Sequence, residues 1–369
     1  MSDWIRKIAK QEAAHFVYAP IPATPARQSP VIQETAIRAE THYLRVWLSE
    51  MFLQDDSYLY RTFVPVVHSV VSLQFGGNPV LELPCVAGPR NLGLGSTLGK
   101  GVQLNHPLTN LLPFRGGAVA ISSALLAYKQ KDFFQKFVDV PHDVSGLLNA
   151  GQLSATLNVV KSAADGIQNL LGAGDKKVHL VYFQGFGGDT AGGGVSLKSG
   201  YTAVINANAA QFKKDMLFVR NSQPCYGRDI QSAQPLGGYD YMLLRVEAAE
   251  TRDDFLSFQE FAKLLNDAIR EGFKDRAAGD AIIQAAQIAV WASPDLTRAD
   301  RVRVAKGIRT AYEQALPGGT SELLRSVEDR VSILNDHAVA FESRKAIAAA
   351  DALLDQGEVP LARFLEAVN

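Results

Sequence analysis

Three apolar runs decide the fold class of this chain: FVPVVHSVVSLQF at 63–75, VLELPCV at 80–86 and GAVAISSALLAY at 117–128. They belong to a stretch, 62–128, whose only formally charged residues are Glu82, Arg90, Lys100 and Arg115. No apolar run in it reaches the roughly 20 residues that a membrane-spanning helix needs. We therefore expect the rest of the protein, or a partner, to cover this stretch.

The apolar runs predict strands. Valine-rich composition and bounding glycines favour strands at 63–75 and 80–86, whereas the small residues of 117–128 fit a strand or a helix. Further strands are expected at 43–48, 178–183, 201–206, 216–220 and 239–248, with 88–115 mostly loop. The strands do not alternate regularly with helices, so mostly antiparallel sheets are predicted.

Helical periodicity appears in two places. Two inserted helices are expected at 132–138 and 153–171, the second carrying apolar residues at spacings of three and four. After Ala249 the sequence predicts helices at 255–269, 281–292, 297–315, 321–334, 338–354 and 361–368. Thr251–Asp254 has the form of a capping box. The predicted fold class is α+β: a mostly antiparallel, β-rich N-terminal domain with inserted helices, followed by an all-α helical bundle.

Four segments follow from these patterns. Residues 1–17 are expected to hold an amphipathic helix over 2–16, and 18–40 a proline-rich extended linker. Residues 41–250 are expected to form the β-rich domain, and 251–369 the helical bundle domain.

Composition narrows the class of protein. A net charge of −1 makes a nucleic-acid partner unlikely, since non-specific binders carry a large positive excess. Cys85 and Cys225 are the only cysteines; they could pair, but two thiols in 369 residues fit a reducing compartment at least as well. The N-terminus carries charge where a signal peptide would be apolar, so a cytoplasmic location is expected.

Two glycine-rich passages are candidates for ligand-binding loops. The first, 93–101, lacks the Walker A spacing and is not followed by a helix start, so a strand connection is expected there. The second, 185–194, is expected to be a mobile surface loop; closure over a ligand is the alternative, and exposure of the loop would admit a protease near Lys198. Its candidate residues are Gly185, Gly187, Gly188, Gly192, Gly193, Gly194 and Lys198.

A basic helix face is the other candidate binding feature. It consists of Arg298, Arg301, Arg303, Lys306 and Arg309. This face would suit an acidic partner or a phosphate backbone, but without interleaved aromatic residues a solvated helix surface is the favoured interpretation. The seven histidines show no metal-ligand spacing, and no nucleophile motif is present, so no metal, cofactor or catalytic residue is assigned.

The sequence therefore favours a non-catalytic binding or assembly protein. Its apolar β-rich domain would be the interaction surface, and its helical module would regulate or dock. The expected partner is another protein or a second copy. Two alternatives stay open: a soluble precursor of a membrane-inserting, pore-forming effector restrained by the helical half, and a hydrolase with dispersed catalytic residues.

Overall fold

The computed structural model describes residues 16–54, 57–58, 61–74, 81–87, 102–129, 176–187 and 195–316. The chain divides into two compact units. The first comprises Met1–Lys263 and Ala286–Lys306, and the second comprises Leu264–Ala285 and Gly307–Asn369.

Three sheets build the described part of the first unit. The first sheet has the order β1-β12-β16-β3-β7, with β8 also pairing β3, and its neighbours are antiparallel. Its strands are β1 (Phe16–Ile21), β3 (Tyr43–Phe52), β7 (Val102–Pro107), β8 (Leu112–Pro113), β12 (Gly200–Asn206) and β16 (Tyr241–Ala249).

The second sheet has the order β11-β10-β9-β5-β4, with β6 also pairing β5. Its strands are β4 (Ser57–Tyr58), β5 (Arg61–Gln74), β6 (Leu81–Ala87), β9 (Ala118–Lys129), β10 (Lys176–Gly187) and β11 (Val195–Ser196). The third sheet, β15-β14-β13-β2, is small. It consists of β2 (Gln28–Ser29), β13 (Leu217–Arg220), β14 (Gln223–Tyr226) and β15 (Gln234–Pro235), with a short 3-10 turn, η2 (Lys214–Met216), before β13.

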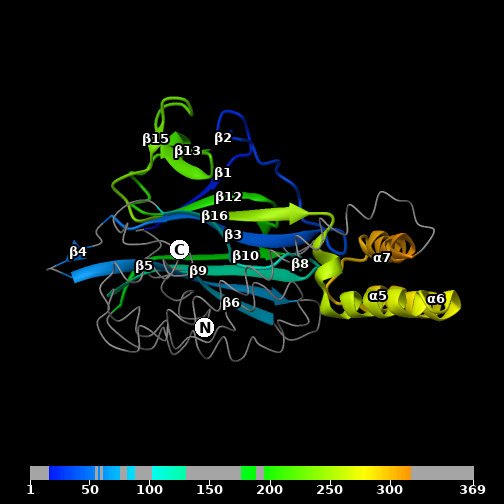
Figure 1. Cartoon of the computed structure of the whole chain (residues 1–369). Coiled ribbons are helices and arrows are strands. Elements are labelled where there is room, and N and C mark those ends of the chain that lie inside the picture. Colours follow the sequence, from blue (N-terminus) through cyan, green and yellow to red (C-terminus); the bar gives the residue numbers. More distant parts are fainter. Residues whose placement is uncertain are drawn as a thin grey trace, which may run out of the picture. The chain divides into compact units, whose positions relative to one another are not determined.

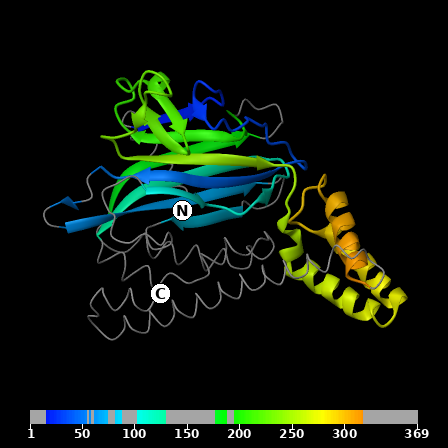
Figure 2. The ribbon, with the colours of Figure 1, turned by 45° about the horizontal axis from the view of Figure 1, so that its top comes forward.

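The first sheet lies between the other two and packs an apolar core against each of them (Figure 1). Successive side chains of a strand point to opposite faces. Val46 and Leu244 accordingly join the core shared with the second sheet, whereas Tyr241 and Leu243 join the core shared with the third. Figure 2 shows the same layers from another side. This arrangement explains why so much of β3 and β16 is apolar.

The charge-poor stretch is largely interior where it is described. β5 pairs with both β6 and β9, and buried residues of all three strands belong to the core with the first sheet. The strands expected at 63–75 and 80–86 are confirmed, and 117–128 is a strand rather than a helix. The expectation of mostly loop over 88–115 is wrong for 102–107 and 112–113, because β7 and β8 extend the first sheet along β3.

The proline-rich linker is also partly a sheet element. Phe16–Ile21 form β1, which pairs along its full length with β12, and β2 pairs with β13, so the expected spacer over 18–40 is wrong at both places. Pro20 is tolerated because β1 ends the first sheet's strand order, where a missing N–H need not break a ladder. The helix expected over 2–16 lies outside the described residues, except for Phe16.

Helices follow the last strand, as the sequence predicts. They are the 3-10 turn η3 (Asp254–Ser257), α5 (Gln259–Gly272), α6 (Arg276–Ala292) and α7 (Arg301–Ala315). The mixed α+β class, with antiparallel sheets before helices, is confirmed. The helices expected at 132–138, 153–171, 321–334, 338–354 and 361–368 lie outside the described residues.

A close backbone approach organises the second unit. A Cβ added to Gly279 would come within 2.3 Å of the Tyr312 hydroxyl and 2.8 Å of the Ala268 carbonyl oxygen. A Cβ added to Gly272 would come within 2.7 Å of the same hydroxyl. Tyr312 is fully buried. The two glycines therefore give α5 and α6 the space they need around this tyrosine.

Candidate functional site at the strand-to-helix junction

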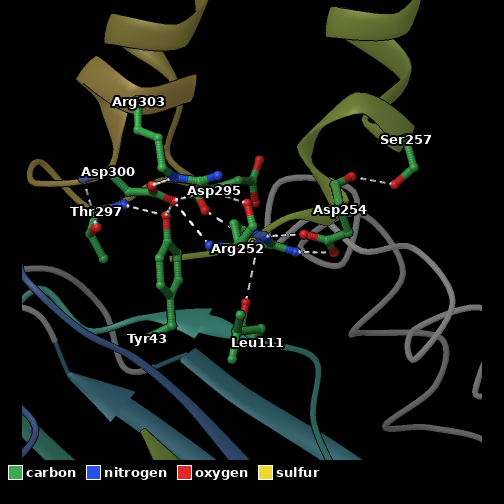
Figure 3. A network of polar contacts seen from close by, with 9 residues as sticks. All are labelled: Tyr43, Leu111, Arg252, Asp254, Ser257, Asp295, Thr297, Asp300 and Arg303. Atoms are coloured by element: carbon green, nitrogen blue, oxygen red, sulfur yellow. Dashed lines mark hydrogen bonds and ion pairs between the residues drawn. The ribbon is translucent and has the colours of Figure 1, made fainter. Parts of the chain in front are cut away.

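A buried polar network joins β3 to the segments that flank the helices (Figure 3). Tyr43 begins β3, Arg252 follows β16, and Asp300 precedes α7. The Tyr43 hydroxyl donates to Oδ2 of Asp300 at 2.9 Å, and the same oxygen accepts the backbone N–H of Arg252 at 3.1 Å. The backbone N–H of Thr297 donates to the Tyr43 hydroxyl at 3.1 Å. Three distant parts of the sequence thus meet on one carboxylate.

The guanidinium of Arg252 is the buried cation of this network. Its Nε and Nη2 each donate to a separate oxygen of Asp254 at 2.7 Å. Its Nη1 donates to the carbonyl oxygens of Leu111 at 3.1 Å and Asp295 at 3.3 Å. The guanidinium carbon also lies 4.5 Å from the centre of the Phe258 ring. A buried charge needs this degree of pairing, because losing one partner leaves it uncompensated.

Asp254 therefore does not cap a helix. Its carboxylate is engaged by Arg252, and η3 begins without a side-chain cap hydrogen bond. The capping box expected at Thr251–Asp254 is wrong for this reason. Because this cap is missing, α5 begins only at Gln259. Phe255 and Phe258, which were expected on the first helical turns, therefore precede it.

Arg303 closes the network from α7. Its Nε donates to Oδ1 of Asp300 at 2.6 Å, and its Nη2 donates to the carbonyl oxygen of Arg252 at 2.6 Å. The hydrogen bond that Arg303 donates to Asp300 is the main cause that raises the pKa of Arg303. Burial raises the pKa of Tyr43 well above its ordinary value. Tyr43 and Arg303 both donate to the carboxylate of Asp300, so this network, the polar junction, links β3 to α7.

Most residues of the expected basic face make local hydrogen bonds or ion pairs. Arg303 belongs to the network, and Arg301 donates to the carbonyl oxygen of Ser293. Arg309 pairs with Glu313 and Asp280. Arg298 and Lys306 are exposed. The helix expected over 297–315 begins at Arg301, so Arg298 precedes it. The five residues therefore do not form one free cationic stripe.

The glycine-rich candidates are only partly described. Gly185 and Gly187 lie at the end of β10, whereas Gly188, Gly192, Gly193 and Gly194 lie outside the described residues. Lys198 makes an ion pair of 2.9 Å with Glu34. The adjoining backbone is bonded to the 33–37 segment, for example through Ile37 N–H and the Leu197 carbonyl oxygen. Ligand closure or cleavage at this passage stays a prediction.

Two further buried polar pairs were missed in the sequence. His179 Nδ1 lies 2.7 Å from Oδ2 of Asp240 and thereby connects β10 to the segment preceding β16. Glu50 is fully buried; its Oε1 accepts hydrogen bonds from Tyr241 and Gln223, and its Oε2 has no partner in the described part of the chain. Burial raises the pKa of Glu50. Neither pair has a local sequence signal, since their members lie 61 or more positions apart.

Other chemical features are few where the structure describes the chain. Cys85 and Cys225 are buried free thiols, and burial raises the pKa of Cys85 to about 12. Among the residues described, no group of histidine, cysteine and acidic side chains could hold a metal ion. None of the described helices has the length and apolar character required to cross a membrane.

No protein-family model, curated protein or solved structure matches this chain.

Proposed function

We propose that this chain is a non-catalytic assembly protein that associates with a second copy of itself through the outward face of α6. The observation that carries the proposal is the exposure of Ile288 (69 %) and Trp291 (50 %) on that helix. Between residues 281 and 292 the sequence contains no charged side chain. Apart from Gln284, the exposed side chains between residues 281 and 292 are apolar, and an exposed apolar helix face is typical of one that has a partner.

The exposed face of α6 can pack against the same face of a second copy, because it has small residues at one end and large residues at the other. Its exposed positions run from Ala277, Ala278 and Ala281 at one end, through Gln284 and Ala285, to Ile288 and Trp291 at the other. If two α6 helices pair antiparallel about a twofold axis near residues 284–285, Ile288 of one copy meets Ala281 of the other. Trp291 then meets Ala278. Large residues thus fill the space left by small ones, as close packing requires.

The polar junction supports this role by fixing the segment that follows α6. Asp295, Thr297 and Asp300 are all buried, and each is bonded within the network of Tyr43 and Arg252. A docking helix whose end is held firmly loses little conformational freedom on association. We infer that the helical segment forms a bundle domain beginning near residue 250, which includes the helices expected after 317. The proposal retains the cytoplasmic location expected from the sequence.

The expected affinity is modest. One pair of 17-residue helices buries less surface than the roughly 1,600 Å² of a standard interface, so a dissociation constant in the micromolar range is expected.

Point variants of exposed apolar residues test the surface. Ile288→Asp places one charge from each copy in the apolar contact. We expect this variant to be a monomer in size-exclusion chromatography with light scattering. Val302→Asp is the matched control, because Val302 is also exposed (62 %) but lies on α7. Association that survives Ile288→Asp, or is lost equally in Val302→Asp, would contradict the proposed surface.

A further inference from the structure

Two arginines flank a tryptophan on the first sheet. The guanidinium carbon of Arg245 lies 4.7 Å from the centre of the Trp47 ring, and that of Arg45 lies 5.2 Å from it. Arg245 is directly opposite Trp47 in the pairing of β16 with β3, and Arg45 is two residues before Trp47 on the same strand. Both cations therefore rest against one indole ring.

These three side chains point away from the main core. Leu44, Val46 and Leu244 belong to the core shared with the second sheet, so their neighbours along each strand lie on the opposite face. Arg45, Trp47 and Arg245 are half-buried there. The group is thus accessible on the face that also carries the third sheet.

Neither guanidinium makes a hydrogen bond or ion pair within the described part of the chain. The Nε atoms of Arg45 and Arg245 are buried without a partner, whereas the terminal nitrogens are not among the buried unpartnered atoms. Each guanidinium carries five N–H donors in a planar fork. The terminal donors are therefore free to meet an acceptor that arrives from solvent.

Glu247 is the acidic neighbour of the group. It is opposite Arg45 in the strand pairing, and its Oε2 accepts the indole N–H of Trp47. This hydrogen bond fixes the ring against which the guanidinium groups stack. One carboxylate against two guanidinium groups leaves a net charge of about +1, so the surface favours an anion.

We propose that Arg45, Trp47 and Arg245 form a binding site for a phosphate group, carried by a lipid headgroup or by a free phosphorylated compound. A phosphate offers more acceptor oxygens than a carboxylate, and in more directions, so it is the better match for two guanidinium forks. The site is independent of the α6 surface.

Two probes separate the sources of phosphate. Pyrophosphate is titrated into the full chain by calorimetry, and flotation is measured with phosphatidylcholine vesicles containing phosphatidate. We expect saturable, salt-sensitive binding of at least one probe. Pyrophosphate binding assigns a free phosphate compound, and vesicle binding alone assigns a lipid headgroup. If neither probe binds, the site is refuted.

Variants tie the binding to these residues. Arg45→Gln and Arg245→Gln are each expected to weaken binding about tenfold, the effect of losing hydrogen bonds to a charged group. Arg298→Gln, a change of an exposed arginine outside the site, is expected to leave binding unchanged. Glu247→Gln keeps an acceptor for the indole but removes the repelling charge, so it should tighten binding. It also provides a test if the arginine variants fold poorly. Equal binding by all four variants and the unaltered chain would overturn the assignment.

Discussion

The hydroxyl of Tyr43 donates a hydrogen bond of 2.9 Å to the carboxylate of Asp300, across 257 positions of the sequence. Both residues are buried, and the same hydroxyl accepts the backbone N–H of Thr297. This contact links the start of a core strand to the segment between α6 and α7, and so connects the β-rich part of the first unit to its helical part.

Replacing Tyr43 with Phe tests the strength of that contact. The ring stays, but the Thr297 N–H loses its acceptor and Asp300 loses one donor. We expect a loss of about 1–3 kcal/mol in the free energy of unfolding, measured by urea denaturation. Tyr239→Phe is the control, because the Tyr239 hydroxyl makes no hydrogen bond within the described residues. A loss no greater than that of the control would show that the contact contributes little.

Replacing Arg252 with Met tests the buried charge. The change leaves the Leu111 and Asp295 carbonyl oxygens without this donor and removes the partner of Asp254. We expect a loss of about 3–5 kcal/mol, as for other buried pairs broken on one side. The stability of Arg252→Lys should lie between that of Arg252→Met and that of the unaltered chain, because an ammonium keeps the charge but cannot reproduce the forked contacts. Equal stability of Arg252→Met and the unaltered chain in thermal unfolding would contradict this account.

The Asp240–His179 pair predicts loss of stability in acid. Burial tends to raise the pKa of Asp240, but hydrogen bonds from His179 and the Gln54 N–H outweigh it and the pKa is lowered. A carboxyl group whose folded pKa is depressed stabilises the fold above its unfolded pKa of about 3.9. That contribution disappears as pH falls through the folded pKa. The stability difference between the unaltered chain and Asp240→Asn should therefore shrink below pH about 4, and a constant difference would contradict it.

The buried Glu50 predicts a dependence of stability on pH that is opposite to that of Asp240. Burial raises its pKa, so the folded state favours the protonated form. Stability should decline as pH rises from the unfolded pKa of about 4.3 towards the folded one. Glu50→Gln keeps an acceptor for Tyr241 and Gln223 without ionising. Urea denaturation across pH 4–8 should show this variant gaining stability relative to the unaltered chain, and parallel curves would disprove the effect.

Much of the sheet framework could be predicted from apolar runs. The valine-rich β5 and the apolar β16 are recognisable because each buries long hydrophobic segments in the cores. β1 was missed because Pro20 and Pro22 are typical of a spacer, whereas its position at the end of a sheet tolerates proline. Short β7 and β8 depend on pairing with β3, which local composition does not reveal.

The polar junction could not be predicted, because its members are brought together only by the fold. Arg252 and Asp254 are close in the sequence, but the pattern Thr251–Asp254 suggested a helix cap rather than an ion pair between them. Tyr43 gave no sign that it would meet the segment before α7, and Leu111 gave none that it would meet Arg252. Similarly, Arg45 and Trp47 are two residues apart, but their relation to Arg245 follows from the strand register. Tertiary contacts, rather than local patterns, decide these sites.

Sedimentation equilibrium of the unaltered full chain tests the central claim of self-association most directly. The chain has a mass of 40.0 kDa. At concentrations of tens of micromolar, we predict an average mass that rises towards twice this value and returns to it on dilution. A mass that stays at 40.0 kDa over the whole range would contradict assembly through α6.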